Sequence, residues 1–169
     1  MAKSFSLERI SFLIPVSVAL IVADHASAQL TKQDKQSIAT TIATEINRAV
    51  DKHREIVDLR EKVIRRLSEC AFMFGAMSRN PEVATRNAEE RQRVADVAEI
   101  SIEVAIRITD GWGGIDRYKT IVDLAASSVK EMGERQDKNE LRLFLQSCRL
   151  FNQPKSTKEI EDALLELHF

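Results

Sequence analysis

This sequence of 169 residues contains 26 acidic side chains that could carry out acid–base chemistry, but no pair of them stands out from ordinary surface charge. Its three histidines are His25, His53 and His168, and only His53 lies far from both ends. The positions three and four residues from His53 hold alanine, valine and isoleucine, so a helix would place no second metal ligand beside it. The motifs G-x-S-x-G, H-E-x-x-H and C-x-x-C-H and the phosphate-binding glycine loop are absent. We therefore expect no enzyme, and no bound metal or cofactor.

The two cysteines, Cys70 and Cys148, each fall on an apolar stripe of an expected helix. Thiols in an oxidising compartment tend to pair, so the sequence predicts a Cys70–Cys148 disulfide. That bond would join the end of the first helix to a helix near the C-terminus. Two buried free thiols are the alternative, and a catalytic dithiol is disfavoured because the chain has no C-x-x-C spacing.

The first 28 residues have the layout of a secretory signal peptide: a basic start, an apolar stretch over 10–23, and the small residues Ala26-Ser27-Ala28 before Gln29. A retained membrane anchor is the alternative, but a bilayer span needs about 20 apolar residues, and this stretch is shorter and contains Pro15. We predict that 1–28 is cleaved and that 29–169 forms one periplasmic or secreted domain. The mature chain is expected to have no transmembrane segment.

Charge is nearly balanced, with 25 basic and 26 acidic side chains and a formal net charge of −1. A nucleic-acid binder would need a basic footprint. The densest basic cluster, which includes Lys62, Arg65 and Arg66, is flanked by Glu61 and Glu69. We therefore expect a solvated helix face there and no nucleic-acid partner.

Residues 31–77 have a continuous helical pattern with no proline and no glycine before Gly75. Apolar side chains recur every seven residues in two neighbouring columns, which predicts one very long N-terminal helix. The shorter helices could not cover its whole apolar face, so we expect Ile42 and Ile46 to be exposed in the monomer and to face a partner. The first column holds Ile42, Ala49, Ile56, Val63, Cys70 and Met77, and the second holds Ala43, Val50, Val57, Ile64 and Ala71.

His53 and Arg60 lie one heptad apart in the middle of this apolar face. A polar layer in a helical seam can fix register or partner choice, so both residues are candidates for a partner-facing site. The alternative is that the bundle covers only the later half of the long helix and leaves His53 in solvent.

The rest of the sequence predicts shorter helices, and hence an all-α fold: an up-and-down bundle of four to five helices. For residues 100–108 a β-strand is the alternative, because β-branched residues alternate there. The helices are expected from Pro81 to about Thr109, from Asp116 to about Arg135, from Asp137 onward, and after Ser156, where Glu159 completes a capping box.

We expect an exported helical bundle that acts through protein–protein interaction and not through catalysis. The partner would be a second copy, giving a homo-oligomer, or another protein of the cell envelope. Trp112, in a glycine-rich loop, could anchor a partner or fold back over helix ends. A bundle that binds a small hydrophobic ligand, in an apolar cavity near Phe74, Ile106 and Phe144, is the alternative. The partner-facing candidates are Ile42, Ile46, His53, Arg60 and Trp112.

Overall fold

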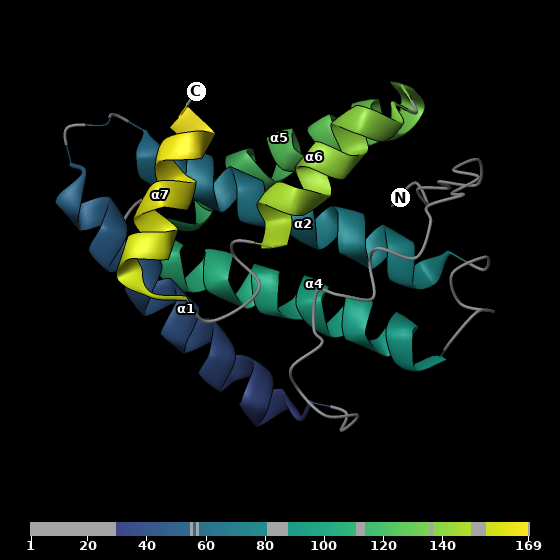
Figure 1. Ribbon diagram of the computed structural model, residues 1–169, viewed down its shortest axis with the longest axis horizontal. Helices are drawn as coiled ribbons and strands as arrows, with labels where there is room; N and C mark the ends of the chain where they lie inside the picture. Colours follow the sequence, from purple (N-terminus) through teal and green to yellow (C-terminus); the bar gives the residue numbers. More distant parts are fainter. Residues whose placement is uncertain are drawn as a thin grey trace.

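The computed structural model describes residues 30–54, 56, 58–80, 88–110, 114–135, 137–149 and 155–168. These residues form six α-helices and no strand, labelled here as in Figure 1. The all-α prediction is confirmed, and the strand alternative for 100–108 is wrong because one helix runs through those residues. The helices are α1 Lys32–Lys52, α2 Leu59–Arg79, α4 Ala88–Thr109, α5 Gly114–Arg135, α6 Lys138–Arg149 and α7 Thr157–His168.

The N-terminal pattern forms two helices of 21 residues each, so the prediction of one very long helix is wrong. α1 is capped by His53, whose backbone N–H donates to the carbonyl of Val50. α2 begins after Asp58, whose φ of 66° lies in the left-handed region. The heptad columns continue across the break because they depend only on the spacing of apolar residues in the sequence. That spacing is the same whether the chain continues straight or changes direction.

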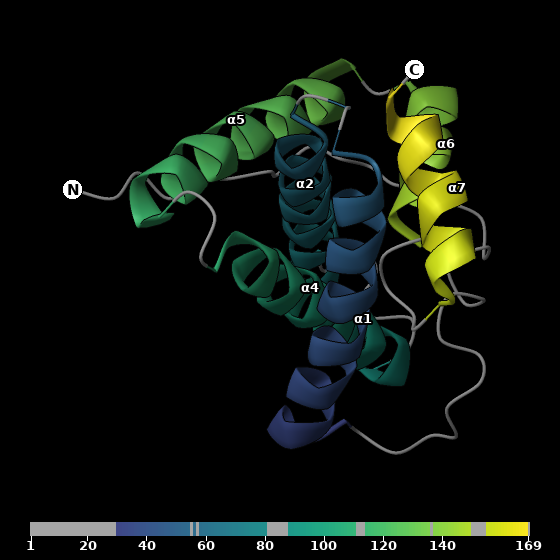
Figure 2. The same cartoon turned by 90° about the vertical axis from the view of Figure 1, so that its left-hand side faces the viewer.

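The break allows α1 and α2 to pack on different neighbours. α2 and α4 run side by side through the middle of the molecule, and α5 also packs on α2 (Figure 1). α1 packs instead on α4 and on α7, which lies beside it in both views (Figure 2). The described helices thus surround an α2–α4 pair, and the expected up-and-down bundle is not confirmed.

The backbone conformation of Asp58, in the turn between α1 and α2, can be tested by substitution. Its side chain makes no capping hydrogen bond, and its carbonyl accepts from the N–H of Lys62. We expect Asp58→Val to lower the free energy of unfolding by about 2 kcal/mol, because a β-branched side chain is strained at positive φ. The control variant Asp58→Gly, which has no Cβ, should stay close to wild type in urea denaturation. Equal stability of the two variants would contradict the left-handed corner.

Side-chain caps fix where α1, α6 and α7 begin. Thr31 and Asp34 form a complete capping box at α1, and hydrogen bonds from the Thr31 side chain and backbone hold the pKa of Asp34 below its ordinary value. Asp137 Oδ1 accepts from two backbone N–H groups of α6. At α7, backbone and side-chain hydrogen bonds from Ser156 lower the pKa of Glu159. Because these interactions are local, the sequence pattern predicted these starts to within a few residues.

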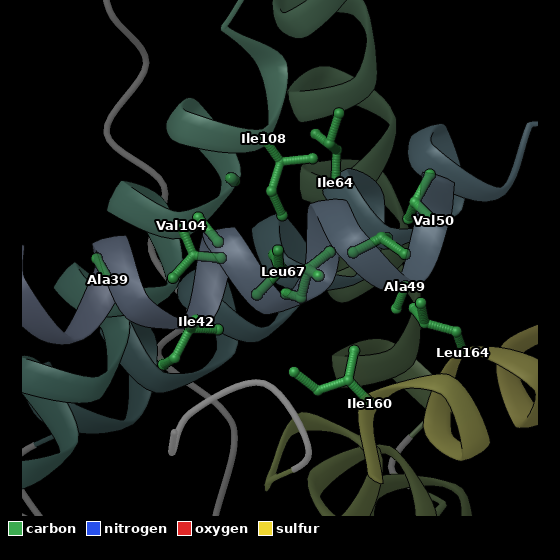
Figure 3. Close-up of a cluster of buried hydrophobic side chains, with 14 of the residues drawn as sticks. Ala39, Ile42, Ala49, Val50, Ile64, Leu67, Val104, Ile108, Ile160 and Leu164 are labelled. Carbon is green, nitrogen blue, oxygen red and sulfur yellow. The ribbon is translucent and has the colours of Figure 1, made fainter. Parts of the chain in front are cut away.

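The core consists of two apolar clusters that share α2 and α4. The first joins α1, the first half of α2, the second half of α4, Ile121 of α5, and α7 (Figure 3). The second joins the second half of α2, the first half of α4, the later part of α5, and α6. α2 and α4 therefore position the remaining helices, and any functional surface on them has a rigid support.

Candidate functional site

Ile42 and Ile46 are only 1% and 0% exposed within a single chain. Figure 3 shows Ile42 in the same cluster as Leu67 of α2 and Val104 of α4. The prediction that this face of α1 is exposed in the monomer is wrong, because α4 and α7 cover it once the chain turns at Asp58. These two isoleucines are core residues.

Arg60 ties three helices together near the corner. Its Nη1 donates to Asn47 Oδ1 at 3.1 Å and to the carbonyl oxygen of Ile108 at 3.3 Å, and its Nη2 donates to Asp51 Oδ1 at 3.4 Å. Asn47 and Asp51 belong to α1, and Ile108 is in the last turn of α4, where a cation is favourable. The side chain is only 19% exposed. Arg60 therefore positions helices of its own chain, and a role facing a partner stays a prediction.

The structure says less about the other two partner-facing candidates, His53 and Trp112. His53 is partly buried and caps α1 through its backbone, and a role facing a partner stays a prediction. Trp112 lies outside the described residues, together with Gly111 and Gly113, so its role as a partner anchor also stays a prediction.

Cys70 and Cys148 are both fully buried and form a disulfide between α2 and α6, with an S–S distance of 2.06 Å. Arg66 of α2 adds a second contact, since its guanidinium carbon lies 5.2 Å from the centre of the Phe144 ring of α6. Glu69, which is also buried, holds Arg65 and Arg66 by ion pairs. This region fastens α6 to α2.

Of the three residues expected around a ligand cavity, two pack together and Ile106 lies apart. Phe74 and Phe144 are 1% and 4% exposed and pack in the second cluster. Ile106 is 46% exposed and belongs to neither cluster. The prediction that Ile106 lines an interior cavity is wrong, because α4 buries the sides that face α1 and α2 and leaves Ile106 on a third side.

A charged cluster links the start of α1 to α4. Lys35 Nζ donates to Asp96 Oδ1 at 3.0 Å and also to Glu99, and Gln92 Nε2 donates to Asp96 Oδ1 at 2.9 Å. Desolvation lowers the pKa of Lys35, but hydrogen bonds and charge from Glu99 and Asp96 outweigh it and hold that pKa above its ordinary value. The buried Asp96 carboxylate thus has two donors, which suits a structural contact.

Ile102 and Ile106 form the one pair of exposed large apolar residues that lie a single turn apart on the same described helix. They are 43% and 46% exposed on α4. Residues four apart are neighbours on a helix surface, so the two side chains are adjacent. The other exposed large apolar residues, Phe72, Leu124 and Leu143, lie on three different helices. We define the α4 outer face as Glu99, Ile102, Glu103, Ile106 and Arg107.

Charged side chains border the two isoleucines along one side of α4. Arg107 Nη2 lies 3.7 Å from Glu103 Oε2, and both side chains are 36% exposed. Within the part of the chain that the structure describes, the buried Nε of Arg107 has no hydrogen-bond partner. Glu99 is paired with Lys35. An apolar pair bordered by charges has the composition of a small protein-binding surface.

The exposure of Ile102 and Ile106 was not predicted from the sequence. Residues 100–108 hold apolar side chains on nearly every side of α4, so periodicity did not identify the exposed one. Glu99, Glu103 and Asp110 recur at helical spacing beside the two isoleucines. Those three acids were the available signal for the solvent side.

The described residues contain neither a metal-binding group nor a membrane-crossing helix. In those residues, no group of three or more histidines, cysteines, aspartates and glutamates is placed to hold a metal ion. A membrane-spanning helix needs a long, largely uncharged apolar stretch, and none of the helices in the described ranges has one. No protein-family model matches the chain, and neither the curated proteins nor the solved structures give a match.

Proposed function

We propose that this chain is an exported protein that acts by binding another protein through the α4 outer face. The observation that carries the proposal is the adjacent exposure of Ile102 and Ile106 on one helix. Apolar surface left in water costs about 25 cal/mol per Å², so covering both side chains with a partner is favourable.

The packing of α4 on its neighbours favours binding at its outer face. α4 packs on α1 along one side and on α2 along another, and its buried residues belong to both core clusters. A helix held in this way presents its outer side chains with little backbone freedom left to lose. Binding to a preorganised surface loses less conformational entropy than binding to a loop.

Export is supported by two features of different kinds. The sequence of residues 1–28 has the basic, apolar and small-residue segments of a signal peptide. The Cys70–Cys148 disulfide is typical of proteins outside the reducing cytosol. A partner would then be met in the periplasm or outside the cell.

Site-specific photocrosslinking in the native host tests the surface. We expect p-benzoylphenylalanine at Ile102 or Ile106 to form a discrete crosslinked product on irradiation, because a bound partner would lie within reach of the side chain. Leu143 of α6 is the matched control, since it is an exposed leucine, at 59%, on a different helix. The same probe at Leu143 should give no such product.

The mass of each crosslinked product shows whether the partner is a second copy of the chain or a different protein. The Leu143 control shows whether crosslinking is specific to the α4 outer face. A product at both isoleucines but not at Leu143 supports the proposed surface. No product at either isoleucine, or equal products at all three positions, would remove it.

A further inference from the structure

We propose that the occupant of the α4 outer face is a second copy of this chain, with the two α4 helices antiparallel about a two-fold axis. This inference rests on the proposed function, because it names the partner for the same surface. It is drawn from the residue pattern of the face, which is complementary to itself.

Antiparallel pairing centred between Ile102 and Ile106 matches the apolar residues. It places Ile102 of each copy opposite Ile106 of the other, because a two-fold interface uses the same patch on both copies. The two positions are separated by about 6 Å along the helix axis, at 1.5 Å per residue. Four isoleucine side chains would therefore form one apolar cluster between the helices.

The same pairing matches the charges. Glu103 and Arg107 each follow an isoleucine by one residue, so both lie on the same side of the apolar pair. Antiparallel packing then places Glu103 of each copy diagonal to Arg107 of the other, offset by about 3 Å along the axis, which these long side chains can span. Symmetry produces this contact twice. A second copy thus matches the face in the positions of its apolar side chains and of its charges.

Arg107 also has hydrogen-bonding capacity that the described residues leave unused. Its Nη2 is 3.7 Å from Glu103 Oε2, which is too long for a hydrogen bond, and in the described part of the chain its Nε has no partner. Buried N–H groups are usually satisfied. A rotation of the guanidinium toward Glu103 of the second copy would give the bidentate geometry that arginine and carboxylate favour.

Net charge and area set the expected strength of this dimer. A formal net charge of −1 gives two copies little mutual repulsion. The apolar part of the face is two isoleucines per copy, which is small beside the roughly 800 Å² per partner of a standard interface. The dimer should therefore be weak, and its population should depend on chain concentration.

Charge reversal tests the pairing. In Glu103→Arg, positions 103 and 107 are both arginine, and in Arg107→Glu they are both glutamate. Like charges then face each other across the dimer, so each variant alone should dimerise at least about tenfold more weakly than wild type. An equimolar mixture restores two opposite-charge contacts per dimer. The mixture should associate to within about threefold of wild type. Sedimentation equilibrium of the chain from Gln29 to Phe169, which contains every described helix, measures these constants.

Controls separate pairing from folding. Glu131→Arg reverses an exposed charge on α5 and should leave the wild-type dissociation constant unchanged. Circular dichroism of each variant verifies that it is folded before association is compared. A wild-type chain that sediments as a monomer at every concentration overturns the inference, and so does a mixture that associates no better than its components.

The two proposals fail in different ways. A crosslink from Ile102 to a different protein, together with a mixture that stays monomeric, overturns the second copy as partner and leaves the proposed surface in place. A failure to crosslink at either isoleucine removes the surface itself, and the second-copy inference with it.

Discussion

Replacing Ile42 and Ile46 together by aspartate is expected to unfold the protein. Both side chains are at most 1% exposed and lie where α1 meets α4 and α7. The change removes two buried side chains worth about 2 to 5 kcal/mol each and adds two carboxylates without partners. Their sum rivals the whole stability of a typical domain, about 5 to 15 kcal/mol. Circular dichroism at room temperature should show loss of helix.

The matched control is Ile102→Asp with Ile106→Asp, the same substitution at the same four-residue spacing on α4. Those side chains are 43% and 46% exposed, so the control variant should keep wild-type helicity and melting behaviour. If the Ile42 and Ile46 variant were instead a folded monomer, the described packing of α1 would be incorrect, and its face would again be a candidate surface for assembly.

Removing the disulfide is the second change with a large expected effect. Cys70 and Cys148 are 78 residues apart in the sequence, and both are fully buried. Closing a loop of that length restricts the unfolded chain, which corresponds to about 4 kcal/mol in the chain-entropy model. We expect the Cys70→Ala, Cys148→Ala variant to lose most of this amount in urea denaturation. Alanine is used because it leaves no buried hydroxyl without a partner.

Reductant provides the internal control for this prediction. Wild type unfolded in the presence of dithiothreitol should approach the stability of the double-alanine variant, whereas the variant itself should not respond to the reductant. Stability of the variant within about 1 kcal/mol of oxidised wild type would show that the bond contributes little to the fold.

Helix starts that depend on local chemistry could be predicted from the sequence. Ser156 with Glu159, and Asp137 before α6, are capping patterns whose partners lie within three residues. The disulfide partners were also predictable, because two cysteines allow a single pairing. The capping patterns depend on short spacing, and the disulfide pairing depends on composition. None of these features requires knowledge of how distant helices pack.

The corner at Asp58 could not be located from periodicity, because the same heptad columns serve one long helix or two shorter ones. One local signal was present: Asp51 to Glu55 is a run of five polar residues, longer than one helical turn. What decides between the alternatives is tertiary. Turning the chain covers the α1 face with α4 and α7 of the same molecule, which a straight helix would leave in water. The exposed pair Ile102 and Ile106 was missed for a related reason, since only the neighbours of α4 determine which of its sides is free.

The packing of α1 against α7 has a consequence for when the protein can fold. Lys52 of α1 and Glu161 of α7 form an ion pair across 109 residues of sequence, and Ile160 and Leu164 complete the cluster around α1. Such non-local contacts form late, because loop closure must precede them. A chain emerging from the ribosome would hold an incomplete first cluster until α7 had been made. Completion of the first cluster therefore waits for the last described helix, and α1 would stay without its α7 contacts while the preceding residues are made.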